Sequence, residues 1–284
     1  MTKREDFGEF ETAWCPGCGN FSILKALKTA LAESDLAPHQ VLMVSGIGQA
    51  AKTPHYLRCN VFNGLHGRAL PAATGAKLAN PRLHVFVESG DGCSYGEGGN
   101  HFLAALRRNP NITMLVHDNQ IYGLTKGQAS PTTPHGQITK AQPHGAPSDA
   151  FNPVAVAVTM HAGFVARGFA GMPDHLANLF RQAHAFQGFA LVDILQPCVS
   201  FNKVNTFDWY KQRVQEIPPG HDPTDWSQAM ALAQEFGERI PIGVIYRNET
   251  RPTFESHFPI LQKGPLLGRS PNKAKVKQLM ESFM

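Results

Sequence analysis

The chain has 284 residues, 42% of them hydrophobic, which is enough to bury a substantial core as one large domain or two modest ones. Its net charge of +4 is spread over Lys and Arg along the chain, with no block of like charges and no basic run interleaved with aromatics, so we expect no nucleic acid partner. No apolar run reaches the length of a membrane span, and residues 1–10 lack the apolar core of a signal peptide, so we expect a cytoplasmic protein with no membrane partner.

Four nearly continuous apolar runs predict buried parallel strands, at residues 41–47, 83–90, 112–119 and 189–197. Stretches with apolar residues at helical spacing alternate with these runs, at residues 20–33, 67–80, 97–109 and 173–186. Strands that alternate with helices indicate βαβ units. The pattern therefore predicts an α/β fold with a doubly wound, mostly parallel sheet.

Two regions depart from this alternation. Residues 126–153 are polar, rich in proline and glycine, and long for a loop, and loops of that length are usually functional or mobile. From about residue 200 the pattern weakens, and residues 246–259 predict an extended tail. We therefore expect a main domain over residues 1–210 and a C-terminal extension over residues 211–284 that packs on the domain or on a partner subunit.

The cysteines indicate metal, cluster or redox chemistry. There are five, an odd number, which argues against a secreted disulfide framework. Cys15 and Cys18 form a C-x-x-C pair about a Pro-Gly turn in the sequence TAWCPGCGNFS, residues 12–22. In a reducing compartment such a pair is typical of a metal or redox site. By itself it leaves a zinc site and a redox dithiol open.

The ends of two predicted strands suggest a diphosphate site with a divalent cation. One run ends at Gly90-Asp91-Gly92 and soon enters a helix, and bare backbone at a helix N-terminus suits a phosphate. A carboxylate beside a diphosphate requires a cation between the two anions. Asn119 follows the next strand, twenty-eight residues after Asp91, and it and the Ile121 carbonyl would supply further oxygens to Mg²⁺. The alternative is a simple turn and a loop asparagine.

At this point the chain resembles the thiamine diphosphate enzymes, whose signature is GDG, a helix and a strand, then Asn. More narrowly, from Trp14 to about Tyr210, it resembles the β subunits of the 2-oxoacid:ferredoxin oxidoreductases. Besides the GDG and Asn motif, the matching segments are WCPGCGN, SGIG…K at 45–52, LHGRA at 65–69, YGLTKGQASPT at 122–132, FVARG at 164–168 and DILQPC at 193–198.

The resemblance implies that this chain holds the diphosphate half of thiamine diphosphate, while an α subunit supplies the aminopyrimidine half. It assigns Mg²⁺ to Asp91, Asn119 and the Ile121 carbonyl. The residues that it places around the cofactor are Ile47, Gly48, Gln49, Ala50, His66, Gly92, Cys93, Gly123 and Leu124. Two of them have a structural alternative: the histidine as a loop residue bonded to backbone, and the cysteine as a small buried hydrophobe.

The implied reaction is oxidative decarboxylation of a 2-oxoacid to its acyl-CoA, with electrons passed through a 4Fe-4S cluster to ferredoxin, in an (αβ)₂ assembly. Lys52 and Lys126 lie in segments that the family places near the substrate, and we expect them to bind substrate carboxylates. Two surface lysines are the alternative. Two cations favour a dicarboxylate such as 2-oxoglutarate over pyruvate or branched and aromatic 2-oxoacids, which stay open.

The sequence departs from the family at the iron–sulfur cluster. Of the four cysteine ligands that the resemblance implies, Cys15, Cys18 and Cys198 are present, and Gln49 occupies the place of the remaining one. We favour a cluster on three cysteines with a non-thiolate fourth ligand or none. Cys59 could substitute, or the thiols could bind zinc or nothing.

Two other functions follow from these alternatives. One is a cluster-free, thiamine-dependent decarboxylase or acyl transferase subunit. The other is a non-enzymatic zinc module, against which the pairing of Asp91 with Asn119 argues.

Overall fold

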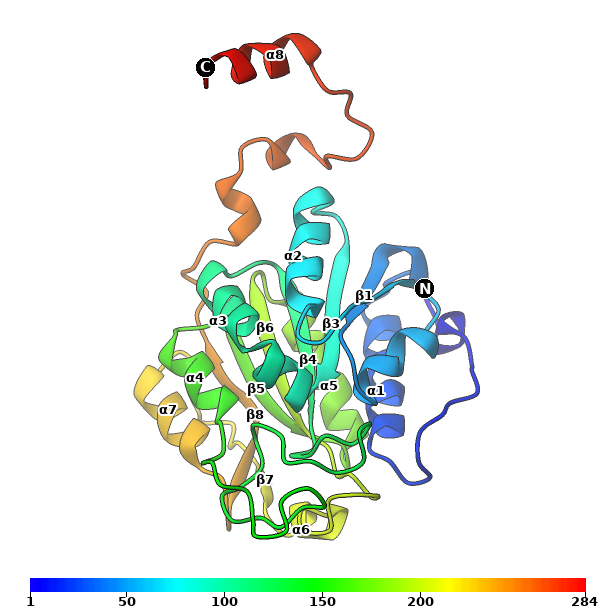
Figure 1. Ribbon diagram of the computed structural model, residues 1–284, viewed down its shortest axis with the longest axis vertical. Coiled ribbons are helices and arrows are strands. Elements are labelled where there is room, and N and C mark those ends of the chain that lie inside the picture. Colours follow the sequence, from blue (N-terminus) through cyan, green and yellow to red (C-terminus); the bar gives the residue numbers. More distant parts are fainter.

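Eight strands form one sheet in the order β2-β1-β3-β4-β6-β5-β8-β7, with helices on both faces (Figure 1). The computed structural model describes all residues, 1–284. Neighbouring strands run parallel, except that β8 is antiparallel to β5. The strands are β1 (Val41–Ser45), β2 (Asn60–Asn63), β3 (His84–Gly90), β4 (Ile112–Asp118), β5 (Phe164–Phe169), β6 (Phe189–Leu195), β7 (Val214–Glu216) and β8 (Ile240–Arg247). The predicted doubly wound, mostly parallel sheet is confirmed.

The helices are α1 (Asn20–Glu33), α2 (Ala69–Ala79), α3 (Gly99–Arg108), α4 (Pro153–Thr159), α5 (Pro173–Ala185), α6 (Phe207–Lys211), α7 (Trp226–Gln234) and α8 (Lys273–Glu281). Tight helical turns cover Ala50–His55 after β1 and Gly92–Glu97 after β3. All four predicted strands and all four predicted helices are present, with ends shifted by a few residues. None of the helices combines the length and hydrophobicity needed to cross a membrane.

Two apolar cores lie on opposite faces of the sheet, because successive side chains of a strand point to opposite sides. On β3, Phe86 joins the core made with α1 and α5, whereas Val85 and Val87 join the core made with α2, α3, α4 and α7. On β4, Leu115 joins the core made with α1 and α5, and Met114 joins the core on the opposite face. Burial on both faces explains why the central strands are nearly continuous apolar runs in the sequence.

The residues after 210 contribute strands as well as a tail. β8 pairs with β5 and carries β7 on its outer edge, so the extended tail begins only after residue 247. These strands are hidden in the sequence because β7 has three residues and β8 contains Pro241 and Gly243. In Figure 1 the tail, in orange and red, leaves the sheet and ends in α8, away from the body of the molecule.

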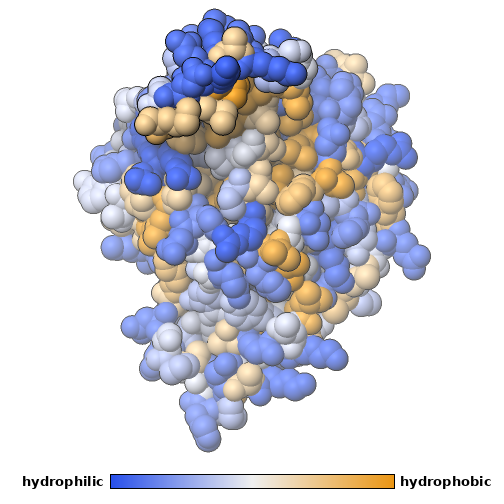
Figure 2. Space-filling view, turned by 45° about the horizontal axis from the view of Figure 1, so that its top comes forward, coloured by the Kyte–Doolittle hydropathy of each residue, from blue (hydrophilic) through white to orange (hydrophobic).

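The far part of the tail has an apolar side that nothing in this chain covers. Figure 2 brings this end forward and shows hydrophobic surface gathered beneath and beside the C-terminal segment. Its large exposed apolar side chains are Leu266, Leu267, Val276, Leu279, Met280 and Phe283.

Asn109 fastens the first part of the tail to the domain. It ends α3 in the left-handed conformation, with φ 57°, and is 1% exposed. Its side-chain Nδ2 donates to the carbonyls of Arg251 and Pro252, at 3.3 and 3.1 Å, while its Oδ1 accepts from the backbone N–H of Phe189 at 2.8 Å. One buried side chain therefore joins α3, β6 and the tail.

We predict that Asn109→Ala lowers the free energy of unfolding by about 2–4 kcal/mol, since it leaves buried partners unpaired and adds left-handed strain. Asn109→Gly removes the same hydrogen bonds but tolerates the backbone, so it should cost about 1 kcal/mol less. Urea unfolding of the two variants measures this difference. Equal stability of the two would contradict the role given to the backbone conformation.

Candidate cofactor and cluster sites

The parallel strands end together at one edge of the sheet. Gly90, the last residue of β3, pairs with His117 of β4, and Asp118, the last residue of β4, pairs with Leu195 of β6. The residues that follow directly are therefore neighbours in space, although they come from distant parts of the chain. Ligand sites of open α/β sheets form at this carboxyl edge.

A cavity of about 560 Å³ opens at this edge and collects the residues predicted for the cofactor. Its lining comes from the turns after β1, β3 and β4 and from the turn before α2. It consists of Ile47, Gly48, Gln49, Ala50, His66, Gly90, Asp91, Gly92, Cys93, Glu97, Asn119, Ile121, Tyr122, Gly123, Leu124 and Thr125. All nine predicted cofactor residues and all three predicted Mg²⁺ ligands are among them. The structure thus brings together residues that the sequence places up to 77 positions apart (47 to 124).

Asp91 is the buried charge of this cavity. It is 1% exposed, and burial raises the pKa of its carboxyl. The Thr132 hydroxyl lies 2.7 Å from Asp91 Oδ2 and also 2.7 Å from Asp118 Oδ1. A hydroxyl has one hydrogen, so it donates to only one of the two carboxyls. Burial, with the nearby Asp193 and Asp91, raises the pKa of Asp118 well above its usual range, which leaves the hydroxyl free to donate to Asp91.

The oxygens around Asp91 suit a hard divalent cation. Asn119 Oδ1 accepts the Ile121 N–H at 3.0 Å, which fixes a turn whose two end residues both line the cavity. A carboxylate, an amide oxygen and a backbone carbonyl are the ligand types that Mg²⁺ takes in proteins. A buried carboxylate is also stabilised when a cation shares its site. The residues present therefore fit Mg²⁺ bound to a diphosphate.

The glycines and the cysteine of this cavity hold its turns close together. A Cβ at Gly92 would lie 2.3 Å from the ring of Tyr122, and Gly48 has φ 123°, a conformation that side chains rarely adopt. Cys93 is buried, and its Sγ accepts the Gly67 N–H at 3.1 Å, so it acts here as a packed small residue. His66 borders the cavity from the turn before α2.

The two predicted substrate lysines are not part of the cavity wall. Lys52 is half-buried in the helical turn that follows Gln49, and Lys126 is exposed in the loop after Gly123, with φ 77°. Neither ammonium takes part in an ion pair within the chain. Both lysines are close in the sequence to residues of the cavity wall, but neither of them lines the cavity in the structure.

A second cavity, of about 400 Å³, collects the predicted cluster residues. It is lined by Trp14, Cys15, Cys18, Asn20, Gln49, Asn119, Gly123, Gln196, Cys198, Val199, Ser200 and Phe201. The remaining candidate thiol, Cys59, lies elsewhere, packed at the edge of the core under α1, so it does not serve as a substitute ligand in this arrangement. Burial, together with the neighbouring Cys198 and Cys15, raises the pKa of Cys18 to about 11. A thiolate here therefore requires a positively charged partner, such as iron.

The three thiols line one cavity but are not arranged around a single ion. No group of three or more His, Cys, Asp or Glu side chains in the chain is arranged to hold one metal ion. In a four-iron cluster each thiolate binds its own iron, so the sulfurs stand farther apart than around one ion. The predicted Mg²⁺ site differs in kind, because only one of its three protein ligands is a carboxylate and the others are amide and backbone oxygens.

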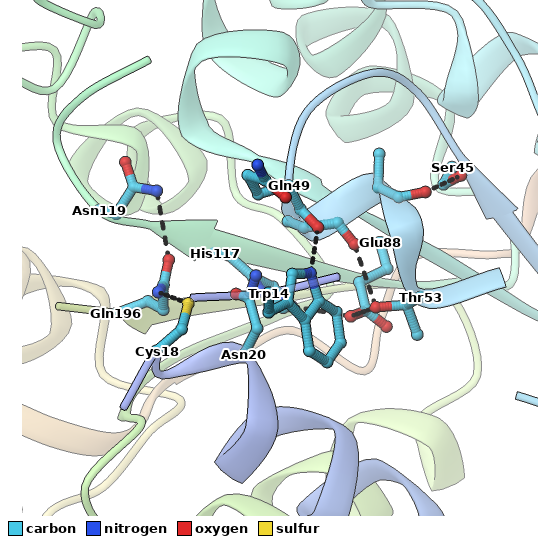
Figure 3. A network of polar contacts seen from close by, with 12 residues as sticks. Trp14, Cys18, Asn20, Ser45, Gln49, Thr53, Glu88, His117, Asn119 and Gln196 are labelled. Atoms are coloured by element: carbon cyan, nitrogen blue, oxygen red, sulfur yellow. Dashed lines mark hydrogen bonds and ion pairs between the residues drawn. The ribbon is translucent and has the colours of Figure 1, made fainter. Parts of the chain in front are cut away.

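Gln196 joins the two cavities by hydrogen bonds, drawn in Figure 3. Asn119 Nδ2 donates to Gln196 Oε1 at 3.2 Å, and Gln196 Nε2 donates to Cys18 Sγ at 3.3 Å. Gln196 is 2% exposed, so both bonds are shielded from water. The cavities also share part of their walls, at Gln49, Asn119 and Gly123.

A buried polar network holds the cysteine turn against the sheet (Figure 3). Asn20, two residues after Cys18, contacts His117 Nδ1 through its Oδ1 at 2.8 Å. His117 Nε2 lies 2.9 Å from Glu88 Oε1, within ion-pair distance, and the Thr53 hydroxyl donates to the same oxygen at 2.5 Å. The start of α1 is thereby tied to β4, β3 and the turn that contains Gln49.

Sequence reasoning missed the residues that connect the parts of the site. Thr132 lies in a segment that matched the family, and Gln196 stands directly before the matched Pro-Cys pair, but neither position signals its partner. Their partners end or follow other strands or, in the case of Cys18, precede α1, and only the folded arrangement brings them within hydrogen-bond distance.

The fold and the site define a thiamine diphosphate-dependent enzyme. Residues 39–194 match the family described as "Thiamine pyrophosphate enzyme, C-terminal TPP binding domain". Residues 198–263 match the family that describes the C-terminal part of the beta chain of pyruvate ferredoxin oxidoreductase.

Individual relatives narrow the class. The chain is 43% identical over 263 residues to 2-oxoacid:ferredoxin oxidoreductase 1, subunit beta, of Aeropyrum pernix, covering 89% of this chain and 82% of the relative. It is 44% identical over 201 residues to 2-oxoglutarate oxidoreductase subunit KorB of Mycobacterium tuberculosis, covering 70% of this chain and 54% of that one. The chain belongs to the β subunits of the 2-oxoacid:ferredoxin oxidoreductases, as its motifs predicted.

A solved structure agrees with this assignment. The 2-oxoglutarate:ferredoxin oxidoreductase from Magnetococcus marinus, with 2-oxoglutarate, coenzyme A and succinyl-CoA bound, matches with a TM-score of 0.91 and 38% identity. The match covers 98% of this chain and 96% of that chain.

We predict that Gln196→Leu weakens Mg²⁺-dependent binding of thiamine diphosphate to the complex with the partner subunit. The leucine leaves the Asn119 amide without its acceptor, a loss of about 1–2 kcal/mol or roughly 5- to 30-fold in affinity. Calorimetric titration measures the change, with Gln182→Leu, exposed on α5, as the matched control. Unchanged affinity in Gln196→Leu would show that this amide does not position Asn119.

Proposed function

We propose that this chain, with an α subunit, oxidatively decarboxylates 2-oxoglutarate to its acyl-CoA and passes the electrons through an iron–sulfur cluster to ferredoxin. The observation that carries the proposal is the contact between the two cavities. A thiol-lined cavity and a diphosphate-type cavity share part of their walls and are linked through Asn119, Gln196 and Cys18. Such adjacency suits a reaction whose electrons leave the cofactor for a cluster.

Each residue of the cofactor cavity has a defined task in this proposal. Asp91, Asn119 and the Ile121 carbonyl hold Mg²⁺, which neutralises the diphosphate next to a buried carboxylate. Thr132 donates to Asp91 and keeps one carboxylate oxygen oriented. The glycine turns let backbone approach the diphosphate closely. Thiamine diphosphate, when bound, supplies the carbon nucleophile and the electron sink for decarboxylation.

Lys52 and Lys126 are proposed to bind the carboxylates of the substrate. Both lie one short turn from residues of the cavity wall: the Lys52 N–H donates to the Gln49 carbonyl at 3.4 Å, and the Lys126 N–H donates to the Gly123 carbonyl at 3.2 Å. Their flexible side chains carry unpaired charges that a substrate dicarboxylate would neutralise. The name of the KorB relative and the ligands of the Magnetococcus structure support 2-oxoglutarate as this substrate.

In this proposal the cofactor site is completed by the α subunit, and coenzyme A takes the acyl group. We further propose an (αβ)₂ assembly that works in the cytoplasm. The coenzyme A and succinyl-CoA bound in the Magnetococcus structure support the acyl acceptor.

A second candidate is a cluster-free, thiamine-dependent 2-oxoacid decarboxylase or acyl transferase subunit. Gln49 alone favours it, because it occupies the position of a thiolate. Iron and acid-labile sulfide analysis of the complex purified without oxygen separates the two candidates. Decarboxylation by a sample that contains no iron would favour the second.

We predict that Asp91→Asn abolishes Mg²⁺-dependent binding of thiamine diphosphate, since a neutral amide attracts the cation far less than a carboxylate. The fold should survive, because the change replaces a buried charged group by a neutral one of the same shape. Titration with the cofactor, with and without Mg²⁺, measures binding, and circular dichroism reports the fold. Asp174→Asn, exposed on α5, is the control. Retained affinity in Asp91→Asn would remove this residue from the site.

We predict that Lys52→Met and Lys126→Met each raise the KM for 2-oxoglutarate by about tenfold or more, because each substitution removes one charge-assisted hydrogen bond to the substrate. Coenzyme A-dependent reduction of a viologen dye, measured without oxygen on several 2-oxoacids, tests this. Lys140→Met, exposed in the same loop as Lys126, should behave as wild type. An equal rise in KM for pyruvate and 2-oxoglutarate in both variants would mean that neither lysine reads the second carboxylate.

A further inference from the structure

The side chain of Gln49 ends in an unsatisfied oxygen, and this residue lines both the cavity of the three thiols and the cofactor cavity. Its Oε1 is buried and has no hydrogen-bond partner. The thiol cavity, which Gln49 borders, is lined by Cys15, Cys18 and Cys198, and these cysteines come from distant parts of the sequence. A buried acceptor without a donor costs about 1–3 kcal/mol, so this oxygen requires a positively polarised partner.

The position of Gln49 is fixed, so the orphaned oxygen is not the end of a free surface chain. The Trp14 indole N–H donates to the Gln49 carbonyl at 2.8 Å, and this tryptophan immediately precedes Cys15 (Figure 3). The cysteine turn and the Gln49 turn are therefore held to each other through the backbone. The other amides at the cavity already have partners: Gln196 donates to Cys18 Sγ and accepts from Asn119, whose Oδ1 accepts from Ile121, and Asn20 Oδ1 contacts His117.

The donor atoms in the wall of the thiol cavity restrict which group can pair with Gln49 Oε1. Three sulfurs and one amide oxygen form a donor set with a single hard member, and iron in clusters accepts both thiolate and oxygen ligands. A magnesium or calcium ion prefers ligands that are all oxygens, and it would leave the three sulfurs without a partner. A lone water would satisfy the oxygen but would leave the three thiols unexplained.

We propose that Gln49 Oε1 ligates the iron that Cys15, Cys18 and Cys198 leave without a protein ligand, so that the cluster has three equivalent corners and one distinct corner. This inference rests on the proposed function, because it requires a four-iron cluster in the cavity. A neutral amide binds iron more weakly than a thiolate does. The distinct iron is therefore the one that leaves first, and the cluster carries one negative charge less than with four thiolates, which raises its reduction potential.

The test uses the full chain in complex with its partner subunit, purified without oxygen and enriched in ⁵⁷Fe. Wild type should contain about four irons per β chain, and one of them should differ from the other three in its Mössbauer spectrum. Mild oxidation in the presence of a chelator should remove that iron selectively and leave the EPR signal of a three-iron cluster.

Two variants of Gln49 test whether its Oε1 atom binds the iron. Gln49→Leu keeps the bulk of the side chain without a ligand atom and should be isolated with one iron fewer than wild type. Gln49→Glu keeps an oxygen and adds charge, so it should retain the fourth iron and lower the reduction potential. The matched control is Gln137→Leu, because Gln137 Oε1 is also buried and unpaired but lines neither cavity. It should match wild type.

Several results would overturn the inference. Equal iron content and equal spectra in wild type and Gln49→Leu would show that Gln49 binds no iron, and so would a wild-type cluster of three irons. Stoichiometric zinc in place of iron would do the same. Thiamine diphosphate binding, measured on the same samples, distinguishes a failure of this inference from a failure of the proposed function. Retained cofactor binding limits the failure to the cluster, whereas loss of both cofactor and iron in wild type would remove the proposed function itself.

Discussion

The parallel register of β3, β4 and β6 is the constraint on which both sites depend. It ends the three strands at one edge, so that Asp91, Asn119 and Gln196 follow as neighbours. A shift of one residue in a strand pairing would turn every side chain to the other face. Because the cores on the two faces use alternate residues, that shift would exchange side chains between them and mismatch the packing of both, so the apolar packing fixes the geometry of the site.

Burial of acidic groups at this edge gives the site its electrostatic character. Burial raises the pKa of Asp193 to about 6, and the Tyr95 hydroxyl donates to its Oδ1 at 2.7 Å. Asp118 and Asp91 both lie 2.7 Å from the Thr132 hydroxyl, which donates its one hydrogen to Asp91. Three carboxyls in so small a volume repel one another, and the buried guanidinium of Arg167 offsets part of this repulsion at Asp193. A cation beside Asp91 would relieve this repulsion. Burial disfavours a carboxylate that has no cation next to it, and it therefore favours the binding of a metal ion.

The sequence predicted the central strands and their flanking helices from local patterns of apolar residues, and its family motifs named part of the lining of both cavities. It did not predict β5, β8 or the connections between cavities. β8 pairs antiparallel with β5 across a register irregularity, and its short, proline-containing pattern carries no clear periodicity. The hydrogen bonds of Thr132 and Gln196 join residues from 14 to 178 positions away, and no local pattern encodes such distances.

The bond between Gln196 and Cys18 also sets a limit on how strongly the two cavities influence each other. A thiolate accepts a stronger hydrogen bond than a thiol does, so filling the thiol cavity with a cluster would tighten the hold on Gln196 and, through it, on Asn119. Coupling between two binding events is reciprocal, so cofactor binding would tighten the thiol side equally. The link is a single chain of two hydrogen bonds, each about 0.5–1.5 kcal/mol, and its effect is therefore bounded at roughly tenfold in either affinity. The wall that the cavities share at Gln49, Asn119 and Gly123 is a second contact between the two sites, independent of this link.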